Sequence, residues 1–305
     1  MKHIFILNPV AGKGRAEIEV LPKVLEAVKD EGIDYEIHRT INVSDATNYV
    51  KNRCMAGNGE PMRFYAIGGD GTLNEVVNGA YGFDNAEVAF IPAGTGNDFV
   101  RVFKNPQFFK DIKRQLGGKA KTIDLIRHND RVFINVLNIG LDCQVVAEVV
   151  HLKKKPFLRG ALAYGVGVAI AFTGNRGCDL TITMEDGRTH QGEITLVAVG
   201  NGAFYGGGFK GIPRAKIDDG LLDVSIIKKV NRRTFLSLVM DYRKGTHLEK
   251  RNAKDLIHYT QCKSLTIHSH KEMQICIDGE LAEAEEIAIS IVPGALRFSV
   301  PDGCE

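Results

Sequence analysis

Tryptophan is missing from this chain of 305 residues, and so are several patterns that would place it in a special class. Its six cysteines form no C-x-x-C pair, which argues against a zinc site or a disulfide framework. The long uncharged run Gly160 to Asn175 is shorter than a bilayer span and is broken by glycines. The net charge of +2 gives no overall attraction for nucleic acid, so we expect no nucleic-acid partner.

What the chain does contain is typical of a soluble protein. It is 44% hydrophobic and 25% charged, which is enough apolar surface for a substantial core. The apolar part of its start, His3 to Leu7, is too short for a signal peptide. The length fits two domains or one large one. We therefore expect a cytoplasmic protein.

The first 120 residues alternate between strand and helix signals. Short apolar strands that alternate with helices predict an α/β domain with a doubly wound parallel sheet. Ligands of such sheets bind at the carboxyl ends of the strands, where the loops after strands meet. The strands are predicted at 3–7, 35–40, 63–67 and 88–91, and the helices at 16–30, 45–55, 72–82 and 97–103.

After about Gly118 the pattern becomes rich in strands joined by turn signals, which predicts a β-sandwich. We expect an α/β domain at 1–120 and a β-sandwich domain at 121–305, whose last residues could pack back onto the first. The predicted strands are 122–127, 131–138, 179–185, 192–199, 222–229, 263–268, 273–277 and 287–292, and the predicted helices are 141–151, 157–173 and 231–245.

Three glycine-rich loops follow strands of the first domain. The most informative runs from Gly68 to Glu75 and places the carboxylate of Asp70 inside a tight turn. The others are Asn8 to Gly14 and Pro92 to Phe99. Free backbone N–H groups in such turns can bind phosphate, and a carboxylate beside phosphate suits Mg²⁺ or a substrate hydroxyl. Each loop alone could be a plain strand-to-helix turn, but three at one sheet edge favour a nucleotide cleft.

These motifs resemble those of the diacylglycerol kinase catalytic family, and most closely its soluble bacterial lipid kinases. The resemblance rests on Gly68-Gly69-Asp70-Gly71-Thr72-Leu73-Asn74-Glu75-Val76-Val77-Asn78-Gly79, on Asn8-Pro9 with Gly12, and on Gly94-Thr95-Gly96-Asn97-Asp98-Phe99. It extends to Gly206-Gly207-Gly208, to Pro213 through Asp223 and to Ile277-Asp278-Gly279-Glu280. The Gly-Gly-Asp-Gly motif alone would also admit NAD kinases and phosphofructokinases.

The resemblance implies an enzyme that binds ATP on its first domain, with substrate entering between the domains. Lys216, Asp219 and Leu221 would hold a Mg²⁺ ion, the first and last through their carbonyl oxygens, and family accounts treat that metal as structural. Asp278 or Glu280 would be the catalytic base, and Asp70 would lie where Mg²⁺ meets phosphate. The residues implied at the nucleotide are Asn8, Pro9, Val10, Ala11, Gly12, Thr40, Gly69, Asp70, Gly71, Thr72, Leu73, Asn74, Glu75 and Thr95.

General chemistry supports these roles. Phosphoryl transfer needs positioning and charge neutralisation, and a carboxylate can accept the proton of a lipid hydroxyl. Without the resemblance, Asp278-Gly279 would read as a hairpin turn and Asp218-Asp219-Gly220 as a plain turn.

The predicted function is an ATP- and Mg-dependent lipid kinase, with diacylglycerol as the first-choice substrate. The alternatives are a kinase of a soluble metabolite such as NAD, or a non-catalytic nucleotide- or lipid-binding regulator. A lipid substrate implies peripheral contact with the inner face of the membrane, for which the basic segment 151–159 is a candidate. Exposed strand edges in the second domain could pair two copies into a homodimer.

Overall fold

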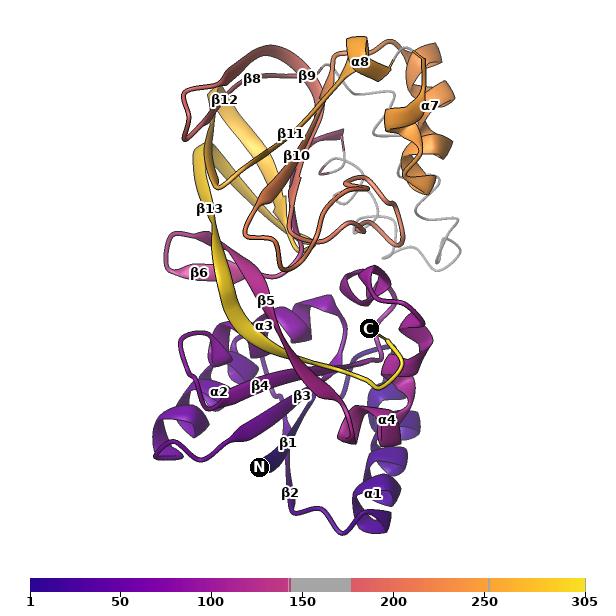
Figure 1. Ribbon diagram of the computed structural model, residues 1–305, viewed down its shortest axis with the longest axis vertical. Helices are drawn as coiled ribbons and strands as arrows, with labels where there is room; N and C mark the ends of the chain where they lie inside the picture. The colour runs from indigo at the N-terminus through magenta and orange to yellow at the C-terminus, as the bar shows by residue number, and fades with distance from the viewer. Residues whose placement is uncertain (142, 144–176, 252, 305) are drawn as a thin grey trace.

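The computed structural model describes residues 1–141, 143, 177–251 and 253–304. The basic segment 151–159 and the helix predicted at 157–173 lie outside the described residues, as does nearly all of the helix predicted at 141–151. The chain forms two halves, drawn in purple and in magenta to yellow, that are joined through a common hydrogen-bonded sheet network (Figure 1).

The first half is built on four parallel strands in the order β2-β1-β3-β4. Their apolar residues alternate between the faces of the sheet. Ile4 and Ile6 pack with α2 and α3, whereas Phe5 and Leu7 pack with α1. Helices therefore cover both faces, as the doubly wound fold predicted. The elements are β1 (Lys2–Leu7), η1 (Ala16–Val20), α1 (Leu21–Asp30), β2 (Tyr35–Arg39), α2 (Asp45–Ala56), β3 (Met62–Gly68), α3 (Asp70–Ala80), β4 (Ala86–Pro92), η2 (Phe99–Val102), η3 (Pro106–Lys110) and α4 (Ile112–Leu116).

The second half is a mostly antiparallel arrangement of strands with its own apolar core. A further cluster of buried residues lies between its strands and the helix α7. The elements are β5 (Lys119–His128), β6 (Arg131–Phe133), β7 (Val136–Gly140), β8 (Cys178–Met184), β9 (Thr189–Gly200), β10 (Leu222–Lys228), α7 (Arg232–Lys244), η4 (His247–Glu249), α8 (Ala253–Leu256), β11 (Ile257–Cys262), β12 (Ser264–Ile277) and β13 (Glu280–Val300).

The long strand β13 connects the two halves (Figure 1). Its first part pairs antiparallel with β12, with Ile277 opposite Glu280. Its last part pairs with β5 and also runs parallel to β4, with Phe298 opposite Val88. The C-terminal end of the chain therefore lies beside the first sheet.

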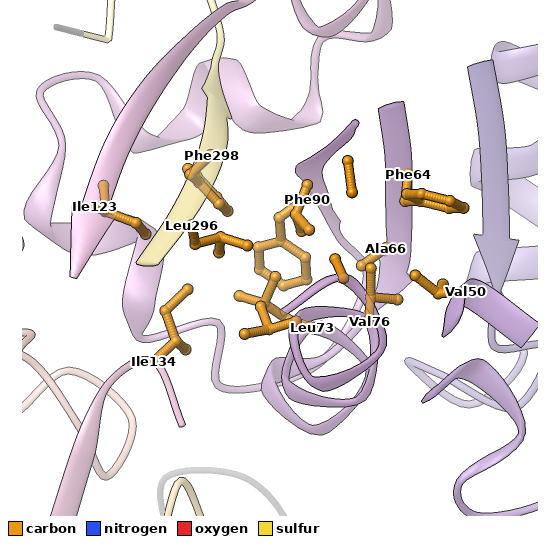
Figure 2. Packing of buried hydrophobic residues seen from close by; sticks show 14 of the residues in the cluster. Val50, Phe64, Ala66, Leu73, Val76, Phe90, Ile123, Ile134, Leu296 and Phe298 are labelled. Carbon is orange, nitrogen blue, oxygen red and sulfur yellow. The ribbon is translucent and has the colours of Figure 1, made fainter. Parts of the chain in front are cut away.

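This crossing strand also completes the core of the first half. Figure 2 shows Phe298 and Leu296 of β13 pointing toward Phe90 of β4 and Leu73 of α3. Phe298 has its ring 5.3 Å from that of Phe99, and both are fully buried. Such aromatic contacts add to the burial of apolar surface, so the two halves are fixed to one another by a shared core.

Several predicted elements differ from the structure. The prediction of a helix at 97–103 was wrong, because Asn97 has a left-handed φ of 55° and only the 3₁₀ turn η2 follows. The strand predicted at 131–138 is two strands, β6 and β7, and those at 263–268 and 273–277 form the single strand β12 with an irregularity between them. The strand β11 was not predicted. The helix predicted at 231–245 is α7.

Candidate active site

Three loops meet at the carboxyl edge of the parallel sheet, where the alternation of strands and helices predicted a cleft. The backbone N–H of Ala93 donates to Gly68 O at 2.7 Å, which ties the loop after β4 to the end of β3. The side-chain amide of Asn8, after β1, donates to Thr72 Oγ1 at 3.1 Å. Because β1 and β3 are neighbours while β1 leads through α1 to β2 on its other side, this edge is a topological switch point, where such folds bind ligands.

Two glycines let these loops approach at backbone distance. A Cβ on Gly12 would lie 2.2 Å from Ala93 O, and one on Gly94 would lie 2.6 Å from Gly69 Cα. Gly12 also has a φ of +60°, which disfavours any side chain. The loops therefore present backbone to one another with no side chain between them, as a phosphate-binding turn requires.

We expect Gly12→Ala to destabilise the protein far more than Gly32→Ala. Both glycines have nearly the same φ, +60° and +62°, but a Cβ on Gly32 meets nothing within 4 Å. The conformational cost of roughly 1 kcal/mol is shared, and the clash at Gly12 adds about 1–3 kcal/mol. Thermal unfolding measures the difference, and the melting temperature should fall further in Gly12→Ala than in Gly32→Ala. Equal melting temperatures for the two variants would contradict the close approach.

Asp70 is the first residue of α3, and its carboxylate joins two of the loops. Its Oδ2 accepts the N–H of Asn97 at 2.7 Å and its Oδ1 accepts that of Asp98 at 3.0 Å. Burial, and then the charge of Asp98, raise the pKa of Asp70 to about 6. This side chain is thus a negative charge fixed at the start of a helix, against the loop after β4.

Asp98 extends this connection to the second half of the chain. Its Oδ2 accepts the N–H of Gly207 at 2.7 Å, and its Oδ1 accepts Nε of Arg101 at 3.0 Å. Gly207 belongs to the Gly206-Gly207-Gly208 segment of the second half. The buried carboxylate of Asp98 therefore holds a loop of one half against a loop of the other.

Asp278 lies in the turn between β12 and β13, where its φ of 46° is left-handed. Its Oδ1 accepts the N–H of Val136 at 2.8 Å and its Oδ2 that of Ile134 at 3.0 Å. Burial and the negative charge of Asp70 raise the pKa of Asp278 to about 7, against the effect of these hydrogen bonds. The charge of Asp70 in the first half therefore affects the protonation of Asp278 in the second.

Glu280, the other acid of the Asp-Gly-Glu motif, has a different environment. Its side chain is 57% exposed, and its Oε2 lies 3.7 Å from Nη2 of Arg131. Backbone N–H groups fix the carboxylate of Asp278, whereas Glu280 is exposed to solvent. The sequence motif alone does not distinguish the two acids.

The predicted metal loop projects from the second half beside β5. Asp219 is exposed and its Oδ1 accepts the N–H of Leu221 at 3.2 Å. The neighbouring Asp218 pairs with Lys121 at 2.8 Å. The loop is held by buried Asp124, whose Oδ2 accepts the N–H of Gly220 at 2.7 Å and whose Oδ1 accepts that of Gly294 at 2.7 Å. No group of three or more His, Cys, Asp or Glu side chains suited to a metal occurs among the described residues.

The other residues expected at the nucleotide differ in how exposed they are to solvent. Val10, Gly71 and Thr95 are exposed at the edge of the sheet, and the N–H of Thr40 donates to Leu7 O at the end of β1. Thr72, Leu73 and Asn74 are buried, and Leu73 belongs to the apolar core (Figure 2). The remaining residues, Pro9, Ala11 and Glu75, are partly exposed.

Two acids of this region had no functional role in the sequence analysis. Asp98 was named only as part of the Gly94 to Phe99 motif, and Asp124 was not singled out. A signal for Asp124 was available, because a carboxylate inside the apolar run Ile123-Asp124-Leu125-Ile126 must be paired if that strand is buried.

Comparisons with known proteins agree with this arrangement. Residues 2–128 match the diacylglycerol kinase catalytic domain, and residues 135–300 match the YegS C-terminal NAD kinase β-sandwich-like domain. The chain is 32% identical over 278 residues to a diacylglycerol kinase of Bacillus subtilis (strain 168), which covers 90% of this chain and 88% of that protein. It is 29% identical to the "Probable lipid kinase YegS-like" protein of Shewanella frigidimarina (strain NCIMB 400), over 100% of this chain and 96% of the other.

Solved structures agree as well. The crystal structure of a diacylglycerol kinase from Bacillus anthracis str. Sterne superposes with a TM-score of 0.72 at 25% identity, covering 100% of this chain and 98% of the other. The fold and the loops at its junction define a kinase of the α/β plus β-sandwich type. The chain belongs to the diacylglycerol kinase catalytic-domain family, in its branch of YegS-type lipid kinases. The predicted fold class and family are thereby confirmed.

Proposed function

We propose that this protein transfers the γ-phosphate of ATP to the hydroxyl group of a lipid, with diacylglycerol as the first-choice substrate and phosphatidic acid as product. The observation that carries the proposal is the junction of the two halves, where Asp70 holds the loop of Asp98 and Asp98 accepts the N–H of Gly207. The charge of Asp70 also raises the pKa of Asp278, which belongs to the other half. Asp70 lies on a glycine-rich loop proposed to bind phosphate, and Asp278 lies in the proposed base motif. Donor and acceptor would meet between them.

The loops of the first half supply the donor side. Their glycines expose backbone N–H groups, and α3 begins at this edge, so developing negative charge on the phosphates would be stabilised there. We propose that the loops after β1, β3 and β4, with Thr40 after β2, hold the nucleotide.

The Asp-Gly-Glu motif supplies the acceptor side. As the lipid hydroxyl oxygen bonds to the γ-phosphorus, the bond from that phosphorus to the bridging oxygen of ADP breaks, and the hydroxyl proton passes to a carboxylate. We propose Asp278 as this carboxylate. Two of its roughly four acceptor sites are used by backbone amides, which leaves others for the hydroxyl. Its raised pKa makes it a stronger base than an ordinary aspartate.

The loop of Lys216, Asp219 and Leu221 is the proposed Mg²⁺ site. One carboxylate and two carbonyl oxygens are hard oxygen donors of the kind that Mg²⁺ prefers, and Asp124 already fixes the loop through Gly220. The donors therefore fit the ion. When bound, Mg²⁺ would neutralise negative charge and order the loop.

Asp219→Ala is expected to raise the Mg²⁺ concentration needed for half-maximal activity by about tenfold or more, since a charged ligand is lost. Asp218→Ala is the matched control, because this neighbouring acid is paired with Lys121. Titration of activity with Mg²⁺ at saturating ATP measures both variants. A metal site elsewhere would be indicated if the two variants behaved alike.

The first assay follows label from γ-labelled ATP into a panel of lipids in mixed micelles, with NAD as a parallel acceptor. Labelled diacylglycerol would support the proposal and a different labelled lipid would correct the substrate. Label on NAD alone would favour the soluble-metabolite kinase. ATP binding without any labelled product would favour a regulator.

A further inference from the structure

The outer face of α7 carries an exposed apolar stripe bounded by cations. Leu236 is 63% exposed and Met240 is 55% exposed, which is unusual for large apolar side chains on a helix. Arg233 precedes them, and Arg243 and Lys244 follow, all three exposed. At about 100° per residue, these five positions fall within an arc of roughly 100°.

The opposite face of α7 anchors the helix to the protein. Leu238 and Tyr242 are buried, and Tyr242 belongs to an apolar cluster that includes Val136 and Tyr205. Asn231 caps the helix start by accepting the N–H of Thr234 at 3.0 Å. The exposed stripe is therefore not a loose end of the fold, because the helix is fixed from behind.

The surroundings of the stripe are strongly basic. Residues 228–256 contain nine Lys and Arg against three Asp and Glu, whereas the whole chain has a net charge of only +2. One of the three acids, Asp241, is paired with Lys250 at 2.6 Å. A basic face with exposed Leu and Met at its centre fits a surface that is both anionic and apolar.

We propose that α7 docks the enzyme on an anionic lipid bilayer, with Leu236 and Met240 inserted at the level of the headgroups and Arg233, Arg243 and Lys244 beside lipid phosphates. This rests on the proposed function in one respect, since a lipid substrate requires an encounter with a membrane. Among the described residues, no helix is long and apolar enough to cross one.

The helix is also joined to the proposed active site. The N–H of Lys210 donates to Arg243 O at 3.1 Å, and the hydroxyls of Tyr205 and Tyr242 are hydrogen-bonded. These contacts hold the loop whose Gly207 donates to Asp98. A bilayer bound at α7 would therefore hold this loop, and the first half that it contacts, in a fixed orientation.

The absence of tryptophan makes a direct test available. Leu236→Trp places a single reporter on the stripe, and Met55→Trp places one on α2, at a methionine that is 63% exposed. With vesicles of phosphatidylcholine and phosphatidylglycerol, and without ATP, we expect a blue-shifted emission and quenching by brominated lipid for Leu236→Trp only. An unshifted Leu236→Trp on protein that co-sediments with the vesicles would overturn the proposal.

Vesicle binding of substituted proteins gives a second test. Leu236→Ser with Met240→Ser should lower the partition coefficient about tenfold or more, whereas Met55→Ser should not change it. Arg243→Glu should lower it at least about fivefold at low salt, with Lys51→Glu on α2 as the control. Wild-type levels of binding by the double variant, or a vesicle-free dimer that depends on Leu236, would contradict a membrane role.

Failure of the proposed function would look different. Binding is measured without turnover, so a protein that docks but phosphorylates no lipid supports the surface and overturns the activity. With a short-chain diacylglycerol dispersed below its micellar concentration, the serine double variant should keep wild-type turnover. If the serine double variant lost turnover of this dispersed substrate but still bound vesicles like the wild type, the proposal would be contradicted. Leu236 and Met240 would then act in the reaction and not in membrane binding.

Discussion

Asparagine in place of Asp70 is expected to lower phosphoryl transfer by about 10²–10³-fold, because it removes a fixed charge at the point where the proposed nucleotide loops and base motif meet. The substitution keeps the shape of the side chain. It also replaces one acceptor oxygen with an amide that cannot accept the N–H of Asn97 or of Asp98, so a modest loss of stability should accompany it.

The control separates these two effects. Asp84→Asn changes an exposed acid in the turn before β4 and should leave both turnover and melting temperature unchanged. For Asp70→Asn, the melting temperature and far-ultraviolet circular dichroism report on the fold, and single-turnover kinetics report on chemistry. A folded Asp70→Asn protein with full turnover would remove Asp70 from the proposed reaction.

The sequence predicted the parallel half of the fold because its signals are local. The strands β1, β3 and β4 are short apolar runs that each lead into a glycine-containing turn, and helices follow the turns after β1, β2 and β3. The position of Asp70 in the Gly68 to Glu75 loop follows directly from that order. No long-range information is needed to place the ends of parallel strands at one edge.

The second half was harder to predict because its strands are long and irregular. Residues 280–286 of β13 are mostly exposed and acidic, and Pro293-Gly294 lies within the same strand, so the pattern suggests several short segments. The strand β11 contains His258, Thr260 and Gln261, which weaken its apolar signal. These strands form because their partners provide hydrogen bonds, which depends on tertiary context.

The contacts that assemble the candidate site join residues far apart in the chain. Asp98 meets Gly207 across the two halves, which the crossing strand β13 joins, and Asp278 meets Ile134 and Val136 because β12 pairs with β7. Motif resemblance named Asp278 and Glu280 together, but it could not show that one is held by backbone amides and the other is exposed. The boundary proposed between domains 1–120 and 121–305 would divide β5 at Lys121.

Asp278→Asn is expected to lower kcat by about 10²–10⁴-fold, the range for loss of a general base. The side-chain NH₂ group of asparagine would replace one acceptor oxygen and lose the hydrogen bond from the N–H of Ile134 or Val136. We therefore also expect a lower melting temperature. Glu280→Gln is the matched comparison, because it removes the charge of the exposed acid without touching these hydrogen bonds. It should leave both kcat and the melting temperature near their wild-type values.

The pH dependence of turnover identifies the base independently of these magnitudes. A base must be deprotonated, and the pKa of Asp278 is raised to about 7, so wild-type kcat should rise as the pH increases through about 7 and then level off. The neutral amide of Asp278→Asn cannot titrate, so this rise should vanish from its residual activity. Asp70→Ala should shift the rise to lower pH in whatever activity remains, since the charge of Asp70 contributes to the raised pKa. If the rise persists in Asp278→Asn and is lost in Glu280→Gln, then Glu280 is the base and Asp278 holds the turn that presents it.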